Sequence, residues 1–174
     1  MSTGLWLYLR CDDRLLAIAA ESIQRALLVE EAPPPQLPPL GAPSGCLGLL
    51  QMHGDRHVAW DLGVLLGLSP ARRAWILLRA PHEEGPLAVA LRTDDCLHVG
   101  AFPHAAALPL PAGILRLRPV FPRAFPVSDV PALHGAPTPV GFELDLDRLW
   151  TEEERTAMRD LLGCAAAEGR SEHA

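Results

Sequence analysis

Apolar and polar residues alternate over short stretches of this 174-residue chain, most clearly at its start. Leucines at every second position over residues 5–10 predict a strand whose neighbouring side chains point to opposite faces. Apolar runs at residues 15–18 and 25–29 predict two further strands, separated by a helical turn at residues 20–23. The chain is therefore expected to begin as strand, turn, strand, short helix and strand.

The strongest pattern occupies residues 45–68. An apolar run reaches Gly54 and Asp55, a second apolar run reaches Asp61, and a leucine-rich turn follows. Because glycine tolerates the positive φ of a tight turn, this pattern predicts a β-hairpin. Asp61 would then tether the following turn through hydrogen bonds from the backbone to its carboxylate.

The second half of the chain has fewer strand patterns. Residues 75–79 and 87–91 are apolar runs on either side of a predicted turn at residues 82–86. In the proline-rich stretch that comes next, only residues 114–117 predict a strand, whereas residues 140–146 alternate clearly. Many short strands separated by glycine and proline predict an all-β barrel architecture with short helices.

A helix is predicted at the end of the chain. Thr151 and Glu154 form a capping box, in which each side chain bonds to the other residue's backbone amide. The helix is expected over about residues 152–167, with an apolar face formed by Met158, Leu161 and Leu162. We expect residues 1–168 to form one folded unit and residues 169–174 to be a disordered tail.

A proline-rich segment, residues 32–43, precedes the hairpin and contains Pro33, Pro34, Pro35, Pro38, Pro39 and Pro43. Proline has no amide hydrogen to donate to a sheet, so the segment is expected to be an extended connector outside any sheet interior. The alternative is that it serves as a polyproline ligand for a signalling module.

Composition and charge narrow the class of protein. A net charge of −6 argues against nucleic-acid binding, which requires a basic face. No apolar run approaches the roughly 18 residues of a membrane span, so direct membrane insertion is not expected. The first residues lack the features of a signal peptide, and four widely spaced cysteines are typical of reduced thiols. We therefore expect a cytoplasmic protein.

Candidate chemistry is sparse. His53, His57 and Asp61 could meet on the hairpin and bind a metal, but zinc requires three or four well-placed ligands. Exposed hairpin histidines are the simpler interpretation. Cys46 with either histidine is the one thiol–imidazole candidate, and packing is the alternative for a cysteine in a glycine-rich strand. We therefore predict no enzyme activity, no metal and no cofactor.

The hairpin resembles a known family. Its frame of Gly48, Leu50, Met52 and Gly54, followed by Asp61-Leu62 and a short leucine-rich segment, is similar to the central signature of the CheW family of chemotaxis adaptors. The opening strands and the ending at residues 146–150 resemble that family too, so the likeness covers nearly the whole chain. It implies two small SH3-like five-stranded β-barrels packed on a shared core, plus a C-terminal helix.

The resemblance also implies partners. A CheW-like protein is a non-enzymatic scaffold of two-component signalling, which binds the regulatory domain of a CheA-type histidine kinase and the cytoplasmic hairpin of a chemoreceptor. Such a protein would be recruited to receptor arrays through these partners. The positions expected to contact a partner, or to shape the contact, are Ile23, Arg25, Gly48, Met52, His53 and Gly54.

The chain departs from the family pattern at charged positions. His53 stands where the family has arginine, Arg25 where it often has an acidic residue, and Arg92 near a usual aspartate. These changes are either tolerated at the rim of an interface or mark a divergent member. A divergent member would bind only one of the two partners, or a different motility or polarity regulator. Trp60 and Trp150 are expected in the core or at an interface.

Overall fold

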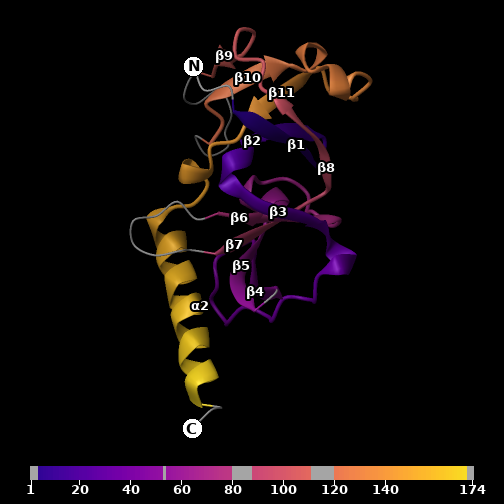
Figure 1. The fold of residues 1–174 in the computed structure, drawn as a ribbon. Coiled ribbons are helices and arrows are strands. Elements are labelled where there is room, and N and C mark those ends of the chain that lie inside the picture. Colours follow the sequence, from indigo (N-terminus) through magenta and orange to yellow (C-terminus); the bar gives the residue numbers. More distant parts are fainter. Residues whose placement is uncertain (1–3, 53, 80–87, 111–119, 172–174) are drawn as a thin grey trace.

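The computed structural model describes residues 4–52, 54–79, 88–110 and 120–171, with side chains described as far as residue 163. Two β-sheets lie one above the other, and a long C-terminal helix runs beside the lower sheet and projects beyond it (Figure 1). His53, the turn predicted at residues 82–86 and the strand predicted at residues 114–117 lie outside the described residues.

The upper sheet has six strands in the order β8-β1-β2-β11-β10-β9. β11 runs parallel to β2, and the other neighbours are antiparallel. Three 3-10 turns accompany this half of the molecule, at Val127–Asp129 (η3), Pro131–Leu133 (η4) and Leu146–Arg148 (η5). The six strands are β1 (Leu5–Cys11), β2 (Arg14–Ala19), β8 (Asp95–Ala101), β9 (Leu108–Pro109), β10 (Arg123–Pro126) and β11 (Val140–Glu143).

The lower sheet has five strands in the order β3-β6-β7-β5-β4. β5 and β7 are parallel, and the other neighbours are antiparallel. The connections include the 3-10 turns η1 (Ala20–Ser22) and η2 (Val29–Glu31) and the four-residue helix α1 (Leu62–Leu65). The five strands are β3 (Ile23–Leu28), β4 (Cys46–Met52), β5 (Asp55–Asp61), β6 (Ala74–Leu78) and β7 (Val89–Thr93).

Apolar side chains form three clusters, one within each sheet and one between them. In the lower sheet, Leu27 from one edge strand and Met52 from the other pack together, so the sheet curls into a barrel. In the upper sheet, Tyr8 packs with Phe125 and Phe102. The largest cluster joins both sheets and the helix through side chains such as Leu9, Trp60, Leu91, Leu149 and Met158. The predicted all-β fold of two SH3-like barrels on a shared core is confirmed.

The strand count differs from the prediction in the upper barrel. Two-residue β9 adds a sixth strand, and β10 lies in the proline-rich stretch where no strand other than 114–117 was predicted. β8 was not predicted because its alternate side chains at Leu97 and Val99 face solvent, so its burial does not follow its hydrophobicity. β9 and β10 each end in a proline, a residue that argues against a strand in most positions, so the sequence did not indicate them. Both strands are short and need few backbone donors.

The C-terminal helix α2 (Glu152–Ser171) begins with the predicted capping box. The Thr151 amide donates to Glu154 Oε2 at 2.8 Å, and the Glu154 amide donates to Thr151 Oγ1 at 3.3 Å. Met158 is buried against the shared core, as its face predicts. The helix extends beyond the predicted end near residue 167, so residues 169–171, assigned by sequence to a disordered tail, are helical. The three alanines at residues 165–167 favour helix up to this point, and the glycine in the continuation, Gly169, costs only about 1 kcal/mol.

Candidate functional site

Of the six positions singled out by sequence, five lie among the described residues, on the two edge strands of the lower sheet and on the turn that follows β4. Ile23 and Arg25 lie on β3, and Gly48 and Met52 on β4, at opposite ends of the strand order in the lower sheet. Arg25 and Gly54 are exposed and Ile23 is half-buried, whereas Gly48 and Met52 are buried. The buried pair can shape a surface but cannot itself be touched by a partner.

Gly48 has a specific structural reason to be glycine. Its φ of +102° is in the left-handed region, and a Cβ built there would lie 1.7 Å from the carbonyl oxygen of Gln36. That close approach lets Gln36 pair with the neighbouring Leu49: the Gln36 amide donates at 2.7 Å and the Leu49 amide at 3.0 Å. The proline-rich segment is thereby fastened to the outer edge of β4.

Asp61 organises the end of the hairpin. Its carboxylate is fully buried and caps α1, accepting from the Val64 amide at 3.0 Å and the Ala71 amide at 3.1 Å through Oδ1. The tether predicted from sequence is therefore confirmed. It reaches further than the next turn, because Ala71 is ten residues along the chain.

Arg92 completes the site around Asp61. It sits opposite Asp61 in the parallel β5–β7 register, and its Nη2 and Nε donate to Asp61 Oδ2 at 2.7 and 3.3 Å. The guanidinium also lies 5.9 Å from the centre of the Trp75 ring, on the inner face of the lower barrel. The arginine that looked like a departure at the rim of an interface is thus the half-buried ion-pair partner of a fully buried carboxylate.

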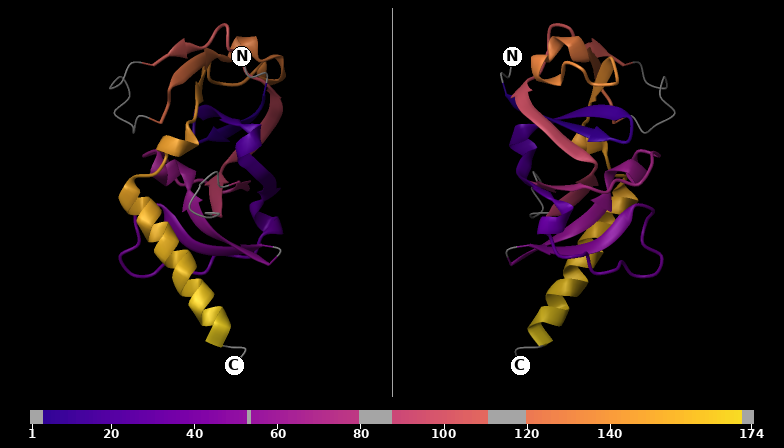
Figure 2. Two further views of the ribbon diagram at one scale, coloured as in Figure 1. Left: turned by 60° about the vertical axis from the view of Figure 1, so that its left-hand side comes forward. Right: turned by 90° about the vertical axis from the view of Figure 1, so that its right-hand side faces the viewer.

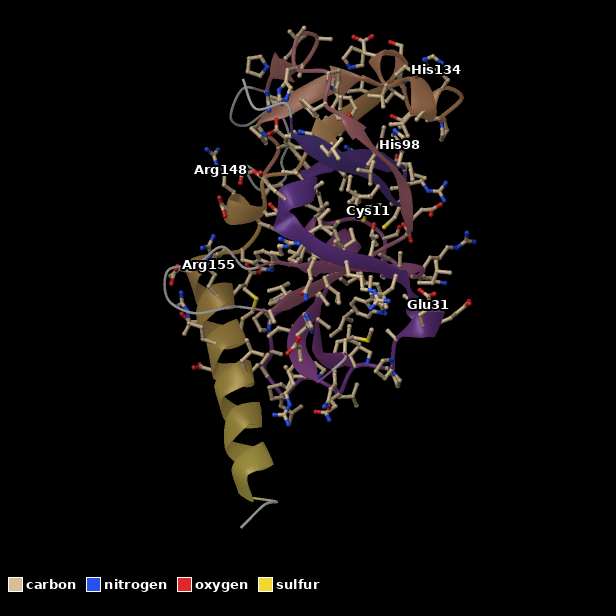
Figure 3. All side chains as sticks on the ribbon, viewed as in Figure 1. Cys11, Glu31, His98, His134, Arg148 and Arg155 are labelled. Atoms are coloured by element: carbon tan, nitrogen blue, oxygen red, sulfur yellow. The ribbon has the colours of Figure 1, made fainter. Side chains whose placement is uncertain are left out.

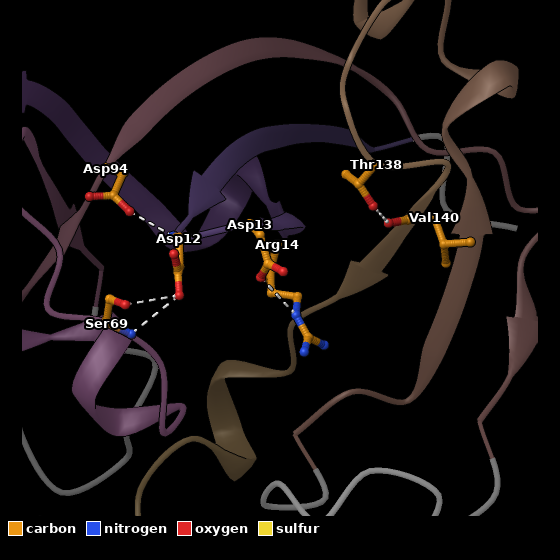
Figure 4. Close-up of polar contacts among 7 residues, drawn as sticks. All are labelled: Asp12, Asp13, Arg14, Ser69, Asp94, Thr138 and Val140. Atoms are coloured by element: carbon orange, nitrogen blue, oxygen red, sulfur yellow. Dashed lines mark hydrogen bonds and ion pairs between the residues drawn. The ribbon is translucent and has the colours of Figure 1, made fainter.

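The loop held by Asp61 contacts the upper barrel. Ser69 donates through its hydroxyl to Asp12 Oδ2 at 3.1 Å, and the Asp12 amide donates to Asp94 Oδ2 at 2.6 Å (Figure 4). Asp94 also accepts from the Arg72 amide at 3.2 Å. Asp12 adopts a φ of +55°, which an aspartate tolerates better than most residues. Together these bonds join the β1–β2 turn to the lower barrel.

Sequence reasoning missed this junction between the barrels. Its members are dispersed at residues 12, 69, 72 and 94, and only the Asp12-Asp13 turn carried a local signal.

Cys11, next to this junction in sequence, lies between the two sheets (Figure 3). Burial, with smaller contributions from nearby aspartates, raises the pKa of its thiol to about 12. Cys11 therefore stays protonated and packs as an apolar side chain.

The Cys46–His57 form of the thiol–imidazole candidate is not assembled, and His53 lies outside the described residues. Cys46 belongs to the shared core, whereas Leu50, the cross-strand partner of His57, belongs to the interior of the lower barrel. Cross-strand partners share a face, so Cys46 and His57 face opposite sides of the sheet. Burial also raises the pKa of the Cys46 thiol. Packing is the interpretation that fits Cys46.

His57 is buried, and the expectation of an exposed hairpin histidine is wrong for it. Only 2% of its surface is accessible, because β5 lies between two strands and is covered on both faces. Its Nδ1 atom is buried without a hydrogen-bond partner. Asp61 is already occupied by two amides and Arg92, and within the described residues no three histidine, cysteine or acidic side chains cluster as metal ligands.

Burial lowers the pKa of His57, with the Asp55 carboxylate and backbone acting weakly in the opposite direction. The unfolded chain therefore binds a proton at higher pH than the folded one. We expect the free energy of unfolding to fall as pH drops below about 6.5, the ordinary histidine value. Urea titrations at several pH values should show a shallower acid-side loss for His57→Leu than for wild type. An identical loss in His57→Leu and in the exposed-residue control His134→Ala would contradict this assignment.

Two tryptophans contribute to the shared core. Trp60 is fully buried there, and Trp150 packs against the same cluster while remaining partly accessible. Both indole nitrogens are buried without a hydrogen-bond partner. Core packing therefore holds for Trp60, which lies in the cluster that joins the two barrels.

Comparisons with known proteins support the fold. No family model matches the chain, and no curated protein matches its sequence. A crystal structure of the scaffolding protein TtCheW from Thermoanaerobacter tengcongensis superposes with a TM-score of 0.66 over 87% of this chain and 95% of that chain. The sequences are 12% identical, so the likeness shows a shared fold. None of the helices in the described part of the chain is long and apolar enough to cross a membrane.

Proposed function

We propose that this protein is a non-enzymatic chemosensory adaptor that couples a chemoreceptor to a CheA-type histidine kinase. The observation that carries the proposal is the two-barrel fold, which the chain shares with a CheW scaffolding protein across almost its whole length. The hairpin signature supports it. Gly48 and Gly54 adopt the positive φ that favours glycine, and Asp61 accepts hydrogen bonds from the backbone amides of the turn that follows it.

The proposed mechanism is scaffolding. An adaptor that holds a receptor and a kinase together raises their effective concentration, and it shifts the kinase between active and inactive arrangements according to which it binds better. To hold the two partners together and to bias the kinase, the adaptor must keep its two binding surfaces in a fixed relative orientation. The shared core and the bonds from Asp12 to Ser69 and Asp94 supply that rigidity here.

The exposed face of β3 is the proposed kinase contact. Arg25 is exposed there, and charge at the rim of an interface selects between partners. We expect Arg25→Glu to weaken binding of the cognate kinase regulatory domain about tenfold or more, which is about 1.4 kcal/mol or more. Calorimetric titration measures this, with Arg148→Glu, a change at an exposed arginine of η5, as the control. Equal affinities for wild type and Arg25→Glu would remove β3 from the contact.

The alternative function is a divergent accessory that binds only one of these partners or a different motility or polarity regulator. The reversed charge at Arg25, exposed on β3, is the observation that favours it. If wild type fails to bind one partner, His53→Arg combined with Arg25→Glu should create that binding. Absence of any gain would count against the accessory interpretation.

A further inference from the structure

The proline-rich segment is held in place at two points. Just before its start the Val29 amide donates to the Arg73 carbonyl at 2.9 Å, and in its middle Gln36 pairs with Leu49 on the edge of β4. Figure 2 shows the segment as a purple loop that projects from the lower sheet. Its base is therefore ordered by the barrel while the residues after Gln36 extend away from it.

Covalent geometry sets the backbone of residues 37–40. Proline fixes φ near −65°, and a residue that precedes proline is restricted to extended or polyproline II conformations. These two rules cover Leu37, Pro38 and Pro39. A turn then ends the run, because the Ala42 amide donates to the Pro39 carbonyl at 3.2 Å with Gly41 at φ +86°. This fits a type II turn, whose second residue, Leu40, has polyproline-like angles.

Leu37 and Leu40 are left in water by this arrangement. They are 91% and 106% exposed, the highest values among the large apolar side chains that the structure describes. A polyproline II helix has three residues per turn and a rise of about 3.1 Å, which places these leucines on one side about 9 Å apart. Two aligned leucines separated by two prolines form a continuous apolar ridge.

We propose that residues 37–40 are a docking ligand for a partner protein whose groove is lined by aromatic side chains. Grooves of that kind accept polyproline II ligands because the ligand is already extended and loses little conformational entropy on binding. The fastening at Gln36 strengthens this preorganisation and turns the leucine ridge outward. The proposal stands independently of the kinase and receptor contacts, since it uses neither β3 nor the hairpin tip.

The test uses the full-length protein in its own cells. The photo-crosslinking residue p-benzoylphenylalanine replaces Gln36, whose side chain is exposed beside the ridge, and in a parallel strain it replaces exposed Ala132 in η4. Each is combined with Leu37→Ser/Leu40→Ser or with the matched control Leu108→Ser, which changes a leucine that is 70% exposed on the upper sheet. The double serine variant should keep the wild-type unfolding midpoint, because both side chains are already in water.

The expected result is one adduct from position 36 that maps to a partner segment containing tryptophan, tyrosine or phenylalanine. Its yield should fall at least tenfold in the double serine variant and remain unchanged in Leu108→Ser. Three outcomes would overturn the proposal: no adduct above that of position 132, an adduct unaffected by the double substitution, or an adduct on a segment without aromatic residues. A crosslinked protein whose yield does not depend on Leu37 and Leu40 is therefore evidence against the proposal.

Discussion

The Asp61→Ala variant is expected to lose about 3–5 kcal/mol of unfolding free energy, the range measured when one member of a buried ion pair is removed. The substitution leaves the Val64 and Ala71 amides without their acceptor and removes the partner of Arg92. Because Asp61 is fully buried, water cannot replace these bonds without entering the core. Chemical denaturation with urea measures the loss.

A graded series separates the contributions at this site. Asp61→Asn keeps an oxygen for the two amides and loses only the charge, so its cost should fall between wild type and Asp61→Ala. Arg92→Met leaves the carboxylate buried without its counter-charge and should also be strongly destabilising. Asp13→Ala is the matched control, because that carboxylate is 79% exposed and should cost less than about 1 kcal/mol. Equal stability of Asp61→Ala and Asp13→Ala would contradict the central role of Asp61.

The Gly48→Ala variant is expected to cost about 2–5 kcal/mol, the second large effect. The left-handed φ of Gly48 alone accounts for roughly 1–2 kcal/mol with any L side chain. The new methyl group would also collide with the Gln36 carbonyl, and overpacking of this kind adds about 1–3 kcal/mol. The expected structural response is detachment of the proline-rich segment from β4, seen as faster amide exchange at Gln36 and Leu49.

Gly54→Ala provides a matched control for this prediction. Gly54 has nearly the same φ, +91°, but a Cβ there would meet no atom within 4 Å. It should therefore carry the backbone cost without the collision. A Gly48→Ala variant no less stable than Gly54→Ala, with unchanged exchange at Gln36, would show that the segment is not fastened by the contact described above.

Local patterns predicted the elements whose burial follows their hydrophobicity. Leucines at alternate positions in β1, the glycine turn between β4 and β5, and the capping box at Thr151 each depend on neighbours in sequence. β8 escaped prediction because its exposed Leu97 and Val99 break the relation between hydrophobicity and burial. His57 escaped for the opposite reason, since a polar residue is buried in a strand covered on both faces.

The candidate site was harder to predict because its contacts are long-range. Arg92 and Asp61 are 31 residues apart and meet through the parallel pairing of β7 with β5, and no pattern near either residue indicates this contact. The same holds for Ser69 and Asp12, which are 57 residues apart. The hairpin pattern located the Asp61 tether, whereas the comparison with the family pattern made Arg92 look like a substitution at the rim of an interface. Only the register of the folded sheet reveals its partner.

Coupling itself is tested most directly by co-sedimentation of purified components. Membranes that carry the cognate chemoreceptor are mixed with the CheA-type kinase, with and without this protein. The proposed function predicts that the kinase sediments with the membranes only when the protein is present, in proportion to its amount, and less when Arg25→Glu replaces wild type. A kinase that remains in the supernatant at saturating amounts of folded wild-type protein would contradict the adaptor proposal.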